Sequence, residues 1–410
     1  MIYLDYAATT PMSEEALAVY AESAKKYFGN ASSLHDIGTA ANELLTICRK
    51  QSAQQIGGEE KGVYFTSGGT ESNVLAIRSL AYAHRHKGKH IITSSVEHAS
   101  VHAVCAQLEQ EGFTVTYVPV DRFGQVNVEA LERALTNETI LVSIQHANSE
   151  IGTIQPLKQI GELLKKKQIV FHSDCVQTFG KIPIDVKQLH LDSISIASHK
   201  IYGPKGVGAV YMNPRVSWHM WLPNTTHEGG FRPGTVNVPG IASFTTAALE
   251  AEKKRETVQK KMNELRRYFL EQIAQKQLPM AVFEHPTAQL PQIVGCLVHG
   301  FEGQYVMLHC NRHGIAISTG SACQVGKQAP SKTMIAIGKE EDEAKQFIRL
   351  SFGAHTTKSD VERLFPYLNS FKKKGCQHEK REKTIRGRTT STHFTMAKRS
   401  ETPDDRNRVG

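Results

Sequence analysis

The sequence predicts an α/β fold with two domains, a large domain built on a mostly parallel sheet and a smaller α+β domain. Up to about residue 211, short apolar runs rich in β-branched residues alternate with amphipathic stretches. This alternation is typical of parallel strands covered by helices. After a long charged stretch at 251–275 the order changes to strand, helix, strand, helix, strand and helix, which indicates the smaller α+β domain.

The individual elements follow from the periodicity of the apolar residues. The expected strands of the large domain are 63–66, 91–94, 115–118, 140–145, 169–172, 193–196 and 208–211. Helices are expected at 72–83, 101–111 and 157–167, where the pattern is amphipathic. In the smaller domain, a helix at 251–275 precedes strands at 292–298, 315–318 and 347–352 and helices at 305–311 and 359–368.

These elements divide the chain into four segments. We expect residues 1–15 to pack against the small domain, 16–250 to form the large domain, 251–370 to form the small C-terminal domain, and 371–410 to be a disordered basic tail. The tail holds twelve Lys or Arg and five Asp or Glu, so it supplies +7 of the net charge of +9. The body is therefore nearly neutral, and the tail is interpreted as a solvated extension, so direct nucleic-acid binding is not expected.

Composition excludes several classes of protein. The 410 residues are 40% hydrophobic, enough for a large core, but no apolar run approaches the length of a membrane span. The start lacks the pattern of a signal peptide, so a cytoplasmic location is expected. Seven cysteines are scattered without a CxxC pair, which argues against a disulfide framework and a zinc ribbon. No metal site is expected.

The most informative segment is 198–206, with the sequence SHKIYGPKG. Lys200 lies between His199 and a glycine-rich turn, so its side chain is oriented. A positioned, desolvated lysine is what a Schiff base with a carbonyl cofactor requires. Read alone, such a tripeptide most often contains an ordinary solvated lysine, so the prediction depends on the sites that accompany it.

Two further sites fall at the carboxyl ends of expected strands, the edge where open parallel sheets bind ligands. Asp174 ends an apolar run, and a buried carboxylate there would keep the ring nitrogen of pyridoxal phosphate (PLP) protonated. Gln177, one helical turn later, could bind the phenolic oxygen of the cofactor. The turn SGGTESN at 67–73, with Gly69 and Thr70, offers backbone N–H groups at a helix start for a phosphate. A plain capped turn is the alternative.

Three more side chains are candidates for chemistry. His98 follows the strand 91–94 at the same edge, where it could stack on a planar cofactor and move protons. Cys323 lies in STGSACQVG, a loop of small residues that would give a nucleophilic thiolate reach and solvent access. Arg349 lies inside an apolar strand, where it could clamp a substrate carboxylate, although an arginine extending to solvent is the simpler reading.

Eight motifs in order, YLDYAATTP, SGGTESN, EHAS, SEIG, DCVQ, SHKIYGPKG, FRPGT and STGSAC, resemble the cysteine desulfurases of the NifS/IscS type. The resemblance covers about residues 1–370. It implies the PLP-dependent transferase fold of aspartate aminotransferase, a homodimer, and PLP bound in the large domain. It also implies that the small domain carries a catalytic cysteine loop.

The resemblance also implies residue roles. Lys200 would hold PLP through a Schiff base, Asp174 would pair with its ring nitrogen, Gln177 with its phenolic oxygen, and His98 would stack on the ring. Arg349 would bind the carboxylate of L-cysteine. The phosphate would be held by Gly69, Thr70, His199 and, from the other subunit, Thr235.

The reaction implied is sulfur transfer. The thiolate of Cys323 would attack the substrate sulfur, leaving a persulfide on the enzyme and releasing L-alanine. The persulfide would pass to an acceptor protein, either an iron–sulfur scaffold or a tRNA-thiolation enzyme.

Two departures from the family pattern concern the site. The pair Asn148 and Ser149 stands where the family usually has two asparagines, so a contact to substrate and cofactor is altered. Ala197 stands where the family has a phosphate-binding serine, and Ser198, one residue later, is counted among the cofactor-binding residues instead. Another PLP enzyme of this fold, such as a selenocysteine lyase or aminotransferase, and a non-catalytic sulfur-relay homologue remain alternatives.

Overall fold

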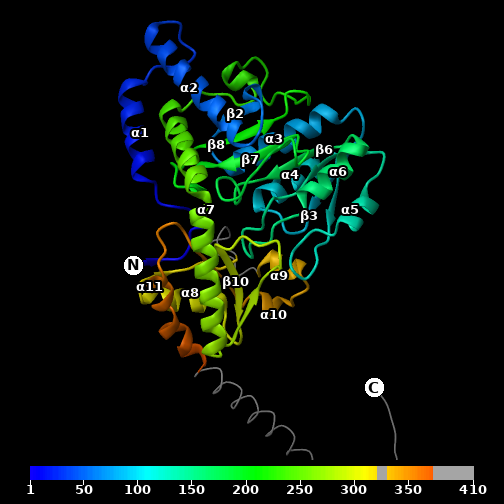
Figure 1. Ribbon diagram of the computed structural model, residues 1–410. Coiled ribbons are helices and arrows are strands. Elements are labelled where there is room, and N and C mark those ends of the chain that lie inside the picture. Colours follow the sequence, from blue (N-terminus) through cyan, green and yellow to red (C-terminus); the bar gives the residue numbers. More distant parts are fainter. Residues whose placement is uncertain (321–329, 373–410) are drawn as a thin grey trace, which may run out of the picture.

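The computed structural model describes residues 1–320 and 330–372. Figure 1 shows an upper and a lower lobe, joined by one long helix, α7 (Val238–Gln275), that runs through both. The upper lobe contains a seven-stranded sheet with the order β2-β8-β7-β6-β5-β3-β4. Its strands are β2 (Val63–Thr66), β3 (His90–Ser94), β4 (Thr114–Val118), β5 (Thr139–Ser143), β6 (Val170–Asp174), β7 (Ser193–Ala197) and β8 (Gly208–Met212).

The sheet is mostly parallel, which confirms the predicted fold class. The pairs β4–β3, β3–β5, β5–β6 and β6–β7 are parallel, and only β8 runs antiparallel to its neighbours β7 and β2. Because β8 follows β7 through a short turn, the chain reverses direction there without a crossover helix. The carboxyl ends of the parallel strands therefore meet at one edge, as the sequence predicted.

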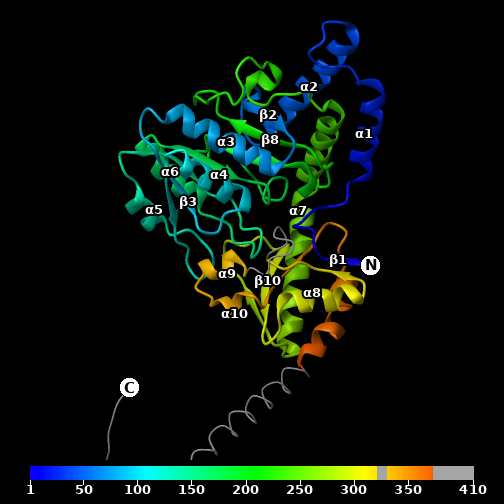
Figure 2. The ribbon, with the colours of Figure 1, turned by 180° about the vertical axis from the view of Figure 1, so that it is seen from behind.

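Helices cover both faces of this sheet, and Figure 2 shows them from behind. Side chains alternate between two apolar clusters, so Ile91 packs with α3 and α4 whereas Ile92 packs with α2, α6 and α7. The helices of this lobe are α1 (Glu14–Lys26), α2 (Asp36–Gln55), α3 (Gly69–His84), α4 (Ala99–Gln110), α5 (Val128–Ala134) and α6 (Leu157–Lys167). Short 3₁₀ helices lie at η1 (Glu60–Gly62), η2 (Ser198–Lys200) and η3 (His227–Gly230).

The lower lobe is a smaller α+β unit. An antiparallel sheet orders β12 (Phe347–Ser351), β10 (Ile293–Val298) and β9 (Met280–Phe283), and β1 (Ile2–Tyr3) pairs in parallel with β11 (Ile315–Ala316). Its helices are α8 (Gly303–Arg312), α9 (Lys332–Ala336), α10 (Glu341–Ala344) and α11 (Lys358–Glu362), with a further helical stretch at 365–372. Ile2 and Leu4 of the N-terminal segment lie in the apolar cluster of this lobe.

The helix expected at 251–275 was predicted too short, because α7 begins at Val238. Asn237 caps it by accepting a hydrogen bond from the backbone N of Gly240 at 3.1 Å, with a proline in its first turn. Its first part is apolar because Ile241 and Phe244 pack on the large sheet, whereas Phe269 packs in the lower lobe. The expected domain boundary at 250/251 thus falls inside one continuous helix.

Other differences are smaller. The sequence analysis assigned no element to α1, α2, α5, β1 or β9, and the strand expected at 315–318 is limited to β11. The helix expected at 359–368 is interrupted at 363–364. In the described ranges no helix combines the length and apolar character needed to cross a bilayer. Most of the predicted basic tail, 373–410, lies outside the described residues.

Candidate active site

The predicted cofactor residues of the upper lobe gather at the carboxyl edge of the sheet. Asp174 is the last residue of β6, Lys200 lies in η2 directly after β7, and His98 is the N-cap of α4 after β3. Gly69 begins α3, which follows β2. The parallel topology brings these positions together, because every parallel strand ends at the same edge.

The ammonium group of Lys200 is held by the N-terminal segment. Lys200 Nζ donates to the carbonyl oxygens of Ala7 at 2.6 Å and Ala8 at 2.7 Å. Gln177 Nε2 donates to the same Ala7 oxygen at 3.0 Å. Two backbone carbonyls thus fix the position of the lysine nitrogen, and they come from a segment that the sequence analysis did not include in the site.

Asp174 belongs to a hydrogen-bonded chain that ends at His98. The buried carboxylate accepts from Asn73 Nδ2 at 2.7 Å and from the backbone N of Val176 at 2.9 Å. Asn73 Nδ2 also donates to Ser100 Oγ at 3.0 Å, and Ser100 Oγ lies 2.8 Å from His98 Nδ1. Because His98 Nδ1 accepts from the backbone N of Ser100, at 3.2 Å, the ring proton is assigned to Nε2.

Asn73 and Ser100 were missed as functional residues. Asn73 is part of the SGGTESN motif and Ser100 of EHAS, but neither motif shows that the two side chains meet. The signal available in the sequence was their position, since both lie within the first five residues of a helix that starts at the sheet edge. Asn73 Oδ1 is buried without a hydrogen-bond partner among the described residues.

His199, the residue before Lys200, is also held by the N-terminal segment. Its Nδ1 lies 3.1 Å from Thr9 Oγ1, and its carbonyl oxygen accepts from the backbone N of Thr10 at 2.9 Å. Burial and the nearby positive charge of Lys200 lower the pKa of His199 to about 4. His199 is therefore neutral at physiological pH and can donate or accept a hydrogen bond without adding charge.

The turn before α3 has the shape of a phosphate site. Gly68 has φ of 150° and open space at its Cβ position, whereas a Cβ on Gly69 would lie 2.8 Å from Val176 Cγ2, so a larger residue at Gly69 would collide with Val176. Thr70 is exposed at the start of this 16-residue helix, where free N–H groups and the helix dipole favour an anion.

Ser198 lies beside the Gly203 turn, and its predicted role in cofactor binding stays a prediction. A Cβ on Gly203 would lie 2.1 Å from Ser198 Oγ, so the hydroxyl is directed at the Gly203 turn. Ala197 Cβ instead faces α3, at 3.7 Å from the Cβ position of Gly69. Successive residues at a strand end point to opposite sides of the sheet. A side chain at position 198 therefore points away from the Gly68–Gly69 turn that a side chain at position 197 faces.

Arg349 lies in β12, on the lower-lobe side of the site, and is almost fully buried. Its Nη2 forms an ion pair with Asp5 Oδ1 at 2.8 Å, and its Nη1 donates to the carbonyl oxygen of Ser149 at 3.0 Å. Its Nε has no partner among the described residues. The guanidinium is thus fixed by Asp5 and the Ser149 carbonyl, and these two contacts leave three of its five N–H groups for other partners.

The side chain of Asn148 is held by hydrogen bonds to the backbone around it. Its Oδ1 accepts from the backbone N of Glu150 and Ile151, at 2.8 and 2.9 Å, and its Nδ2 donates to the carbonyl oxygen of Val96 at 3.1 Å. These bonds shape the loop that presents the Ser149 carbonyl to Arg349. The predicted direct role of Asn148 in substrate binding stays a prediction.

Two predicted residues are placed less directly. Cys323 lies outside the described residues, but the preceding Ser318 is bridged to Arg349 by backbone hydrogen bonds of 3.1 and 2.8 Å. Ser318, five residues before Cys323, therefore lies beside Arg349. Thr235 is exposed on the upper lobe. In the described part of the chain, no group of three or more His, Cys, Asp or Glu could hold a metal ion.

Comparisons with known proteins agree with one another. The family model for class-V aminotransferases matches residues 2–364. The putative cysteine desulfurase NifS of Bacillus subtilis (strain 168) is 53% identical over 366 residues, which are 89% of this chain and 93% of that protein. The cysteine desulfurase IscS of Methanosarcina thermophila is 42% identical over 364 residues, 88% and 90% of the two chains.

The solved structure of a NifS-like protein superimposes with a TM-score of 0.83 at 30% identity, covering 91% of this chain and 98% of that one. Members of this family depend on PLP, and the residues present fit that cofactor: an oriented lysine, a buried carboxylate and an open glycine turn. The chain thus belongs to the class-V aminotransferase family, to the cysteine desulfurases of the NifS/IscS type.

Proposed function

We propose that this protein converts L-cysteine to L-alanine and keeps the sulfur as a persulfide on Cys323. The observation that carries the proposal is the meeting of Lys200 and Asp174 at one sheet edge, each fixed by hydrogen bonds of 2.6 to 2.9 Å. The names of the relatives, cysteine desulfurase NifS and IscS, supply the substrate.

Bound PLP supplies an electron sink for the carbon skeleton of the substrate amino acid. Lys200 would bind the cofactor covalently and, once displaced by the substrate amine, hold and return protons at its Nζ. Asp174 would keep a proton on the ring nitrogen, and the bond from Asn73 holds the carboxylate in place for this. Gln177 would contact the phenolic oxygen, and Gly69, Thr70 and His199 the phosphate.

On the opposite side, Arg349 would bind the substrate carboxylate. The thiolate of Cys323 would then attack the substrate sulfur. The new S–S bond forms as the C–S bond breaks, the electron pair stays with the carbon, and that carbon takes up a proton to become L-alanine. His98, whose ring proton is assigned to Nε2, would move a proton at the same edge.

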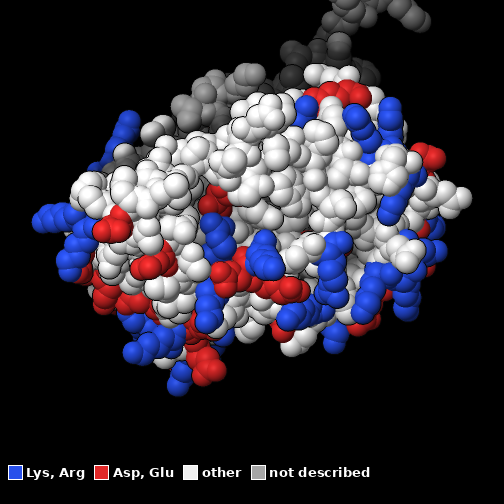
Figure 3. All heavy atoms as spheres, turned by 90° about the horizontal axis from the view of Figure 1, so that it is seen from above, with Lys and Arg blue, Asp and Glu red and all other residues white. Residues whose placement is uncertain are grey.

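A homodimer is part of the proposal. Seen from above, the upper lobe shows a wide area without charged side chains (Figure 3). Large apolar residues of α1, α2 and their connection are exposed, among them Phe28 at 69% and Leu34 at 100%. Exposed apolar area of this kind favours a subunit interface. Thr235 would then contact the phosphate of the partner's site.

The sulfur would pass from Cys323 to an acceptor protein, either an iron–sulfur scaffold or a tRNA-thiolation enzyme, in the cytoplasm. The segment bearing Cys323 follows Ser318, which lies beside Arg349, and carries small residues, which suits a thiol that must reach the substrate and then a partner.

A single-turnover experiment tests the proposal. PLP-loaded protein is mixed with L-cysteine in the absence of a reductant, and L-alanine and protein-bound sulfane sulfur are measured. We expect about one of each per site, because the persulfide blocks further turnover. Cys323→Ser should produce neither, whereas the control Cys376→Ser should match the unmodified protein. Pyruvate in place of L-alanine, or sulfane sulfur formed by Cys323→Ser, contradicts the proposal.

A further inference from the structure

A small cavity lies behind Lys200, between α7 and the segment at 353–354 that follows β12. Its volume is about 60 Å³. Polar side chains in its wall include Lys181, Lys200, Arg255 and Gln292. None of the roles assigned above uses Lys181, Arg255 or Gln292.

Gln292 indicates that the cavity is built for a ligand. The residue is only 6% exposed, yet neither its Nε2 nor its Oε1 has a hydrogen-bond partner among the described residues. A buried amide without partners is unfavourable. The backbone carbonyl of Gln292 accepts from the N–H of Phe352 at 2.8 Å, so the residue is fixed in place. A hydrogen-bond acceptor inside the cavity would satisfy its Nε2 donor.

The charge of the cavity wall indicates which kind of chemical group would bind there. Lys181, Lys200 and Arg255 line it, and no Asp or Glu of the described ranges does. Neither Lys181 nor Arg255 is in any ion pair found in the described part of the chain. Burial, together with the charges of Lys200 and Arg349, lowers the pKa of Lys181 to about 7. The charges of Lys181 and Arg255 in this wall favour an anion.

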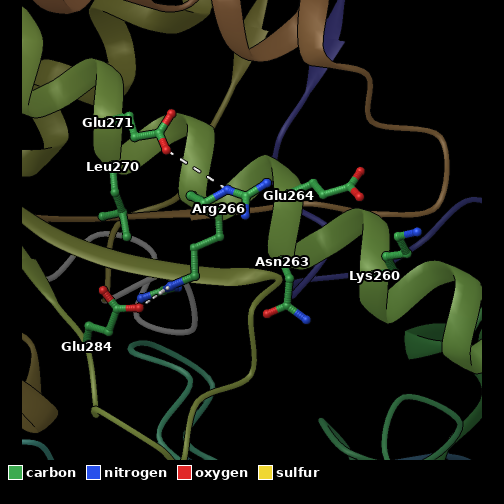
Figure 4. Close-up of a pocket in the computed structure, with 8 residues that line it drawn as sticks. Lys260, Asn263, Glu264, Arg266, Leu270, Glu271 and Glu284 are labelled. Carbon is green, nitrogen blue, oxygen red and sulfur yellow. Dashed lines mark hydrogen bonds and ion pairs between the residues drawn. The ribbon is translucent and has the colours of Figure 1, made fainter.

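A wider hollow on the outer face of α7 provides the contrast (Figure 4). There Arg266 Nε pairs with Glu284 Oε1 at 3.1 Å, and Arg267 Nε with Glu271 Oε1 at 3.9 Å. Its wall carries as many acidic as basic side chains, so its charges are already balanced. The described wall of the cavity behind Lys200 has no acidic side chain to balance its basic ones.

We propose that the cavity behind Lys200 binds one small monovalent anion of the size of a halide, held by Lys181 and Gln292. Its volume of about 60 Å³ is enough for one small ion. Gln292 Nε2 and Lys181 Nζ donate to the ion, and Arg255 contributes long-range attraction. Chloride is the physiological candidate.

The site is connected to the cofactor residues. Lys181 Nζ donates to Gln177 Oε1 at 3.3 Å, and Gln177 Nε2 donates to the Ala7 oxygen that also holds Lys200. The Lys181 carbonyl accepts from Gln259 Nε2 of α7 at 2.7 Å, which fixes the backbone at this point. An anion beside Lys181 keeps its ammonium charged, so the orientation of the Gln177 amide stays fixed.

Anomalous diffraction tests the site directly. Crystals of the full-length, PLP-loaded protein grown in sodium bromide should show an anomalous peak in the cavity, within contact distance of Lys181 Nζ and Gln292 Nε2. Crystals of Gln292→Leu should lose that peak. A cavity that holds only water in bromide, or a peak of the same height in Gln292→Leu, overturns the proposal.

Chloride-35 NMR provides the solution measurement. Line broadening by the PLP-loaded protein should saturate with chloride and be reversed by bromide, and Lys181→Met should weaken the binding at least tenfold. The matched control is Lys260→Met in the hollow of Figure 4, which should bind as the unmodified protein does. Equal loss in Lys260→Met, or none in Lys181→Met, contradicts the assignment.

Discussion

The two sides of the site differ in what holds them. On the upper-lobe side, Lys200 is fixed by backbone carbonyls and Asp174 by the neutral amide of Asn73 and a backbone N–H, at a sheet edge. On the lower-lobe side, Arg349 is held by a charge, the carboxylate of Asp5, 344 residues away in sequence. The comparison teaches that the cofactor side is preorganised, whereas the substrate side depends on an ion pair that the incoming carboxylate must share.

Lys200→Ala should have the largest effect, since the group bound to the cofactor is lost. Turnover of L-cysteine should fall by at least about a thousandfold, the scale seen when a covalently acting residue is removed. The visible absorbance of lysine-bound PLP should disappear while the far-UV circular dichroism is retained. The control is Lys205→Ala, an exposed lysine of the same turn. A borohydride-reducible cofactor bond that survives in Lys200→Ala would place the bond elsewhere.

Asn73→Leu tests the preorganisation of Asp174. The change keeps the shape of the side chain and removes a hydrogen bond to a charged group, which contributes about 1.5–3 kcal/mol. We expect kcat to fall by about 10- to 100-fold, with a shift in the pH dependence of the cofactor spectrum. If only thermal stability falls and the spectrum titrates as before, Asn73 supports the fold and not the carboxylate.

Arg349→Lys and Asp5→Asn test the other side together. Arg349→Lys loses the planar fork, so L-cysteine should bind about 1.5–3 kcal/mol more weakly. Asp5→Asn keeps a neutral acceptor for Arg349, so the loss should be smaller, about 3- to 10-fold in apparent affinity. Spectroscopic titration with L-cysteine gives both values. Tighter binding in Asp5→Asn would mean that Asp5 competes with the substrate and does not position Arg349.

Lowering the pH should reduce the folding stability of the upper lobe gradually, and this effect is smaller than those above. Burial lowers the pKa of His172 to about 3 and that of His146 to about 4, against about 6.5 in an unfolded chain. Between pH 6.5 and these values the unfolded chain binds protons that the folded chain does not, so stability falls as pH falls. Melting temperatures measured from pH 8 to pH 4 should decline below about pH 6.5, less steeply in His172→Gln. The same slope in both proteins would exclude His172 as the cause.

The same comparison explains what the sequence could predict. Asp174, His98 and Lys200 were predictable because each follows a short apolar strand, and parallel topology brings such ends together. Asp5 and the carbonyls of Ala7 and Ala8 were not, because nothing local shows where the N-terminal segment packs. The contacts depend on the pairing of β1 with β11, far apart in the chain.

Two other features could not be predicted, for local reasons. The start of α7 was missed because its first turns are buried on the sheet and lack the charged face of an exposed helix. The direction of Ser198 could not be read from its motif, because a one-residue shift at the end of β7 reverses the direction of the side chain.

Peptide mapping after borohydride reduction tests the central claim most directly. Reduction of the PLP-loaded protein makes the lysine–cofactor bond permanent, and mass spectrometry of the proteolytic peptides then locates it. The account predicts the pyridoxyl group on Lys200 alone, the lysine whose Nζ is held at the sheet edge by Ala7 and Ala8. Modification of Lys181 or another lysine in its place would contradict the assignment of this edge as the cofactor site.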